Sequence, residues 1–90
     1  MCQKAAWACD TGADAGEAGE AANMAKYAAA EAALGALDQS IQTHGGNGMS
    51  SEFGLADMWG LARLMRTAPV SREMILNFIG QHSLQLPKSY

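Results

Sequence analysis

The residues best suited to chemistry lie together between Gln42 and Gly48, a stretch reading Gln-Thr-His-Gly-Gly-Asn-Gly at the end of an alanine-rich segment. Glycine adopts positive φ without steric cost and lets a ligand or a second backbone come close. One interpretation is a helix C-cap, with Gly45 just after the helix and a tight turn following it. The other is a nest of backbone N–H groups, joined by the Gln42 amide, that binds an anion. Spacing alone leaves both interpretations open.

Two common phosphate-binding motifs do not fit this stretch. A P-loop would end in Lys followed by Ser or Thr, and a dinucleotide fingerprint would follow a strand, whereas this stretch follows a predicted helix. The C-terminal end of a helix also carries the negative end of the macrodipole, which repels phosphate. Glycine N–H groups, the Gln42 amide and the start of the next helix would have to outweigh that repulsion.

Charge and hydropathy exclude several classes of partner. The net charge is −3, with only six basic residues. The three arginines, Arg63, Arg66 and Arg72, are too few to follow a phosphate backbone, so no nucleic-acid partner is expected. No run of 18 apolar residues and no signal peptide occurs, so no membrane association is expected and a cytoplasmic location is predicted.

The two cysteines and the histidines do not form a predicted metal site. On a helix the Cα atoms of Cys2 and Cys9 would be roughly 10.5 Å apart, and a disulfide needs less than about 7 Å. Free, buried thiols are therefore expected. There is no Cys-x-x-Cys pair, and His82 has no histidine or cysteine at ligand spacing, so no metal is predicted.

The elements that would hold the glycine stretch are all helices, in one domain over residues 1–90. We expect helices at roughly 1–11, 17–43, 52–67 and 71–83. The second is the most secure, because it is rich in alanine and lacks proline. Apolar residues recur along it at helical spacing: Met24, Tyr27, Leu34, Leu37 and Ile41. Its acidic residues are expected on another face: Glu20, Glu31 and Asp38. Its small residues Ala28, Ala32 and Gly35 would let another helix approach closely.

Helix boundaries follow from capping residues and from one proline. Asp14 with Glu17 forms a possible capping box for the long helix. Ser50 or Ser51 is expected to cap the third helix. Pro69 should end that helix, and Ser71 is a natural N-cap for the last one. So short a chain buries little surface of its own, and we expect it to complete its core on neighbours.

A resemblance assigns the glycine stretch a function. The sequence Gln42–Gly48 resembles the Q-x-x-G-G-x-G motif of the acyl-CoA dehydrogenase family. Further matches lie at residues 5–7, around Ala25-Lys26, and over 66–75. The similarity covers nearly the whole chain, in order. It implies part of the four-helix up-and-down bundle that forms the C-terminal domain of that family, so Met1 would begin a fragment.

The resemblance also implies FAD as cofactor and acyl-CoA as substrate, in a homo- or hetero-oligomer, either dimer or tetramer. The glycine stretch would reach the FAD of a neighbouring subunit, with positions 43 and 44 contributing backbone only. The start of the last helix would approach the subunit's own flavin nucleotide. The cofactor-contacting positions implied in this way are Gln42, Thr43, His44, Gly45, Gly46, Ser71 and Glu73.

No catalytic residue is predicted within the chain. Family members oxidise the Cα–Cβ bond of an acyl thioester, and a carboxylate removes the α-proton. Pro69 occupies the position at which many members carry that glutamate, and the neighbouring Glu73 matches a nucleotide contact. The family's usual Arg-Asp pair is replaced by Gly60-Leu61. The base would then lie upstream, on an earlier bundle helix.

We therefore expect the C-terminal part of a FAD-dependent acyl-CoA dehydrogenase, an oxidoreductase of fatty acid metabolism. The 90 residues alone should bind FAD weakly or not at all and show no dehydrogenase activity. One alternative is a catalytically silent subunit of the family that serves FAD and oligomer contacts. Another is a free-standing helical interaction module whose glycine turn is only a helix cap.

Overall fold

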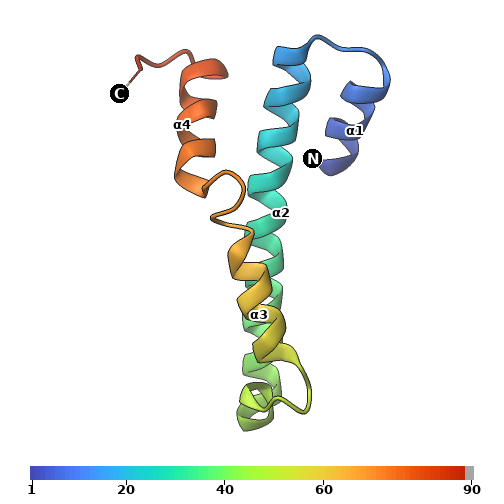
Figure 1. Ribbon diagram of the computed structural model, residues 1–90, viewed down its shortest axis with the longest axis vertical. Helices are drawn as coiled ribbons and strands as arrows, with labels where there is room; N and C mark the ends of the chain where they lie inside the picture. The colour runs from blue at the N-terminus through green and yellow to red at the C-terminus, as the bar shows by residue number, and fades with distance from the viewer. Residues whose placement is uncertain (89–90) are drawn as a thin grey trace.

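The computed structural model describes residues 1–88, and within them all regular structure is helical (Figure 1). This confirms the all-α prediction. The elements are α1 (Cys2–Asp10), α2 (Ala15–His44), the 3-10 helix η1 (Gly45–Met49), α3 (Leu55–Leu64) and α4 (Arg72–His82). None of these helices is long and apolar enough to cross a lipid bilayer.

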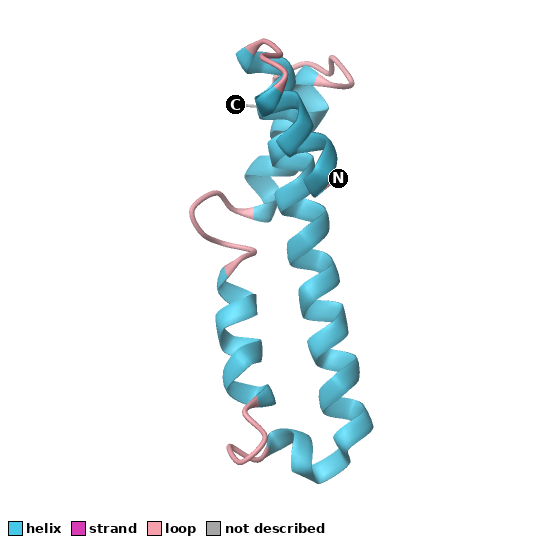
Figure 2. Ribbon diagram, turned by 90° about the vertical axis from the view of Figure 1, so that its right-hand side faces the viewer, coloured by secondary structure: helices cyan, strands magenta, loops and turns pink. Residues whose placement is uncertain are grey.

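The long helix α2 is the axis of the molecule, and every other helix packs on it (Figure 1). α1 returns alongside its N-terminal half, α3 alongside its C-terminal half, and α4 alongside its N-terminal half on another side. Both α1 and the α3–α4 arm run antiparallel to α2. Figure 2 shows the loop that interrupts this arm between α3 and α4. The arrangement is a partial up-and-down bundle.

Side-chain caps fix the starts of α2 and α4. The Asp14 carboxylate accepts a hydrogen bond of 2.8 Å from the Glu17 backbone N–H at the start of α2. The Ser71 hydroxyl accepts one of 3.3 Å from the Met74 N–H at the start of α4. Each satisfies a donor that the first turn of a helix leaves without a partner. Both caps are those predicted from sequence.

The third helix is shorter than predicted and starts differently. It begins at Leu55 rather than at residue 52, and its N-cap is Gly54, with φ 71°. The Ser50 hydroxyl instead accepts from the Glu52 N–H, inside the preceding turn. The prediction of a serine cap was wrong because the chain reverses at Gly54. Gly54 adopts the left-handed conformation, which is unfavourable for residues with a side chain. Beyond Leu64 the chain continues as turns.

The core consists mainly of alanine. The buried apolar residues share a position between α2 and the helices on either side of it: Ala8, Ala21, Ala25, Ala30, Leu34 and Ile75. Ala28, Ala32 and Gly35 are exposed, so no described element uses the small-residue face predicted to admit a neighbouring helix. Cys2 and Cys9 are free but exposed, not buried as expected, because α1 contacts only α2 and leaves its other faces uncovered.

Candidate cofactor-facing turn and the start of α4

The turn at the end of α2 is a helix cap in its geometry. Gly45 has φ 62° and ψ −137°, and its backbone N–H donates to the Gln42 carbonyl. The chain then enters η1 and reverses toward α3 (Figure 1). The C-cap interpretation is thus correct for Gly45. It does not account for the other two glycines.

Two of the three glycines of the turn are required by the fold, for different reasons. Gly45 needs its positive φ. Gly48 is buried, and a Cβ there would lie 2.9 Å from the Ile41 Cα and would also collide with the Ile41 carbonyl oxygen. Gly46 has neither constraint: its φ is not left-handed, it is exposed, and a Cβ would meet nothing within 4 Å. Nothing within the described chain requires glycine at position 46.

The side chains beside these glycines differ in availability. The Thr43 hydroxyl donates to the Gln39 carbonyl at 2.8 Å. His44 Nδ1 lies 2.7 Å from the Ser40 carbonyl oxygen and therefore carries the proton, and its ring packs on that of Phe53, with centroids 5.6 Å apart.

Gln42 is exposed, and its amide makes no hydrogen bond to any residue between 1 and 88. The turn thus offers the uncommitted Gln42 amide as a side-chain donor next to an open backbone.

The second group of predicted positions lies at the start of α4. The Ser71 hydroxyl caps the helix, while Glu73 is exposed. Between them, Arg72 Nε is buried without a hydrogen-bond partner among the described residues, and it lies 3.6 Å from a carboxylate oxygen of Glu73. Pro69 is exposed in the loop just before, where it can accept no proton.

The structure does not bring the two groups of positions together. Arg72 Nη1 lies 3.5 Å from a carboxylate oxygen of Glu31, which places the start of α4 beside the middle of α2. Gln42 lies eleven residues farther along the same helix, a distance of about 16 Å at 1.5 Å per residue. Within one chain, the two groups form separate surfaces.

A charged cluster between α2 and the α3–α4 loop was missed by the sequence analysis. Glu31 receives two hydrogen bonds from Arg66, each 2.8 Å, one from Nε and one from Nη2. Lys26 Nζ donates to the carbonyls of Met65 and Val70, at 2.8 and 2.7 Å. The prediction that Glu31 sits apart from the apolar stripe was wrong.

The spacing of the stripe could have shown that Glu31 needs a charged partner, but not which residue that partner is. Glu31 follows Tyr27 by four residues and precedes Leu34 by three, so all three share one face of a helix. A carboxylate among apolar side chains needs a charged partner. The pKa of Glu31 is lowered, mainly by hydrogen bonding from Arg66. Partial burial acts to raise this pKa, and the charges of Arg66 and Arg72 lower it further.

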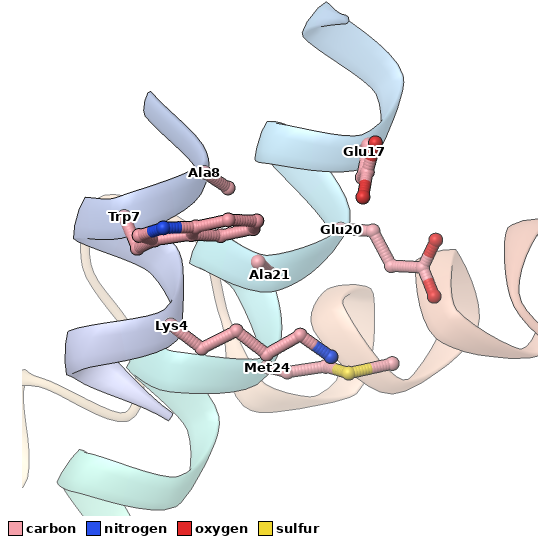
Figure 3. Close-up of a pocket in the computed structure, with 7 residues that line it drawn as sticks. All are labelled: Lys4, Trp7, Ala8, Glu17, Glu20, Ala21 and Met24. Carbon is pink, nitrogen blue, oxygen red and sulfur yellow. The ribbon is translucent and has the colours of Figure 1, made fainter. Parts of the chain in front are cut away.

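The hollow between α1 and α2 is separate from both groups. It has a volume of about 200 Å³, and Figure 3 shows the Trp7 ring extending from α1 toward Ala21 on α2. Lys4 and Glu20 contribute opposite charges to its walls. No serine, cysteine or histidine lines it. Among the described residues, no group of three or more His, Cys, Asp or Glu side chains could hold a metal ion.

The fold and the turn define a class of protein: a partial helical bundle whose longest helix ends in the Q-x-x-G-G-x-G pattern. The family described as acyl-CoA dehydrogenase, C-terminal domain, matches residues 1–84. The chain therefore belongs to the acyl-CoA dehydrogenase family, as its motifs predicted.

Named relatives share this assignment. The chain is 61% identical over all of its 90 residues to the acyl-CoA dehydrogenase FadE12 of Mycobacterium tuberculosis and to that of Mycobacterium bovis, and it spans 23% of the length of each. It is 47% identical over 53 residues to the probable acyl-CoA dehydrogenase IBR3 of Arabidopsis thaliana, covering 59% of this chain and 6% of that protein. No solved structure shows significant similarity to the chain.

Proposed function

We propose that the chain is the C-terminal part of a FAD-dependent dehydrogenase of fatty acid metabolism that oxidises the Cα–Cβ bond of an acyl-CoA thioester. Its role is to contact FAD and neighbouring subunits. The observation that carries this proposal is Gly46, an exposed glycine for which the described chain gives no internal reason. A molecule approaching from outside would supply that reason.

The chemistry of the turn suits the pyrophosphate of FAD. The Gln42 amide is an exposed hydrogen-bond donor without a partner among residues 1–88, and the missing Cβ at Gly46 lets a ligand reach the backbone. Thr43 and His44 direct side-chain donors to carbonyls of α2, and we assign both residues contact through the backbone alone. When bound, FAD supplies the hydride acceptor.

Because the two groups form separate surfaces within one chain, we propose that each contacts a different FAD molecule. We assign Gln42 to Gly46 to the FAD of a neighbouring subunit, and Ser71 and Glu73 to the FAD of the same subunit. Large side chains remain exposed on the described surface, among them Met49, Leu61 and Trp7. Burial of such side chains on other subunits or on the remainder of a longer polypeptide would favour assembly.

The α-proton must be removed by a residue outside this chain. Pro69 stands where the resemblance expects a glutamate, and Glu73 belongs to the nucleotide contact. We place the base on an earlier bundle helix. A catalytically silent subunit is the second candidate, favoured by the same proline. Activity of the full-length protein on a panel of acyl-CoA thioesters separates the two: turnover supports the enzyme, and bound FAD without turnover supports the silent subunit.

The test of the cofactor contact uses the full-length protein. Gln42→Ala and Gly46→Val should each lower the FAD retained after gel filtration, because one removes a donor and the other fills the open backbone. Gly19→Val is the matched control, since a Cβ at Gly19 also meets nothing within 4 Å but lies at the far end of α2. Full FAD retention in both turn variants would refute the assignment and leave a helical interaction module.

A further inference from the structure

The loop of residues 65–71 is fastened to α2 by side chains from both sides. From α2, the Lys26 ammonium donates to the carbonyls of Met65 and Val70, one at each end of the loop. From the loop, Arg66 makes a two-point hydrogen-bonded pair with Glu31, also on α2. These four hydrogen bonds join residues 35 to 44 apart in sequence.

The Lys26 contacts meet a need of the backbone, and the Arg66–Glu31 contact fixes an orientation. The last carbonyls of a helix lack partners and carry partial negative charge. Lys26 supplies a cationic donor to Met65, the residue after α3, and a second hydrogen bond to Val70 just before α4. The planar Arg66 guanidinium matches the Glu31 carboxylate in a fixed orientation that a single hydrogen bond would not impose.

The fastening extends into the first turn of α4. The Arg72 backbone N–H donates to the Arg66 carbonyl at 2.7 Å, which closes the loop on itself. The Arg72 side chain also approaches Glu31, at 3.5 Å. Glu31 and Lys26 therefore hold the loop before α4 and its first residue against α2, next to Ser71 and Glu73.

We propose that Lys26, Glu31 and Arg66 are positioning residues for FAD binding, acting through the start of α4. This inference rests on the proposed function, because it assumes that Ser71 and Glu73 contact the flavin nucleotide. None of the three side chains needs to touch the cofactor. They hold the loop against α2 so that the first turn of α4 presents its contacts in one place.

A second link between α2 and α4 provides the matched control. The Ser83 hydroxyl donates to the Glu20 carboxylate at 2.6 Å, at the opposite end of α4. Ser83→Ala removes this link but leaves the loop fastened. If the three positioning residues only held α4 on α2, loss of either link would weaken FAD binding equally.

The experiment measures the Kd of FAD in the full-length protein by titrating the deflavinated protein, with flavin fluorescence as the signal. Lys26→Met and Glu31→Gln should each raise the Kd about tenfold, by analogy with the loss of a residue that orients a metal ligand. Ser83→Ala should stay within about twofold of the parent, and Lys26→Arg should retain most of the affinity, because arginine also carries several cationic donors. If Glu31→Gln does not fold, the Kd of FAD is measured in Arg66→Lys instead.

The outcomes separate the two levels of the proposal. If Gln42→Ala and Gly46→Val weaken FAD binding but Lys26→Met and Glu31→Gln do not, the positioning role is wrong and the proposed function stands. Equal weakening by Ser83→Ala and Glu31→Gln also overturns the positioning role. If none of these variants, including those in the glycine turn, affects FAD, the proposed function fails with it.

Discussion

Gly48 packs directly on the backbone of Ile41, one turn before the end of α2. A Cβ added at Gly48 would lie 2.9 Å from the Ile41 Cα and 3.0 Å from its carbonyl carbon, and closer still to its oxygen. These neighbours are backbone atoms, which cannot rotate away as a side chain would. This contact folds η1 back against the helix that precedes it, and so places the exposed Gly46 at the outer edge of the turn.

Substituting alanine at these two glycines should have opposite effects on stability. We expect Gly48→Ala to lower the free energy of unfolding by about 1–3 kcal/mol, because overpacking forces the backbone to shift. Gly46→Ala should be neutral or stabilising by up to about 1 kcal/mol, since it restricts only the unfolded chain. Thermal unfolding measures the change in stability of each variant, and amide hydrogen exchange in η1 reports the local effect. Equal effects would show that Gly48 is not packed on Ile41.

The left-handed conformation of Gly54 should matter in the same way at the start of α3. Gly54→Ala is expected to cost about 1–2 kcal/mol, because a Cβ disfavours positive φ. Gly54→Asn should cost less, since asparagine tolerates this region. Gly60→Ala, inside α3, should stabilise by about 0.5–1 kcal/mol, because glycine is a poor residue in a helix interior. Unfolding of the three variants under one condition tests this order.

Local signals predicted much of the fold from sequence. The alanine content predicted α2. Asp14 and Ser71 predicted the starts of two helices, because a cap depends only on residues within one turn of each other. Ser50 and Ser51 misled because the start of α3 depends on a chain reversal at Gly54, which a serine nearby does not reveal. The position of each glycine in φ, ψ space is a property of the whole turn.

The Glu31 cluster was unpredictable for a different reason. Its partner Arg66 is 35 residues away in sequence, and no local pattern states which helix will lie opposite a given face. What the sequence did contain was the conflict of a carboxylate at the spacing of an apolar stripe. For the turn, the motif indicated a cofactor, but only the structure distinguishes Gly46 from the two glycines that the fold itself requires.

The Glu31–Arg66 pair should make stability depend on pH in the acidic range. The pKa of Glu31 is lowered from 4.5 in the folded chain, chiefly by hydrogen bonding from Arg66. A group with a depressed folded pKa contributes stability above its unfolded pKa and loses it as the pH falls through the folded value. The difference in unfolding temperature between the parent and Glu31→Gln should therefore be constant at neutral pH and shrink below about pH 4.5.

Salt provides the control for this prediction. Both side chains are partly exposed, with 28% and 29% of their surfaces accessible, so added salt should reduce the difference at neutral pH without abolishing it. The hydrogen bonds persist where the charges are screened. A difference that grows on acidification would mean that Arg66 does not stabilise the charged form of Glu31.

Ser71 allows its structural role to be separated from its proposed contact with the cofactor. Ser71→Ala should lower stability by about 1 kcal/mol through loss of the cap, whereas Ser71→Asp should keep it, because aspartate caps as well as serine. If Ser71 faces the flavin nucleotide, the added carboxylate should repel the pyrophosphate and weaken FAD binding at low ionic strength.

Asp14→Ser is the matched exchange at the other capped helix start, 57 residues away in sequence, and should leave FAD binding unchanged. Unfolding temperature and FAD Kd, measured on the same three preparations, give the result. Normal stability with unchanged FAD affinity in Ser71→Asp would remove Ser71 from the cofactor site while leaving its cap intact.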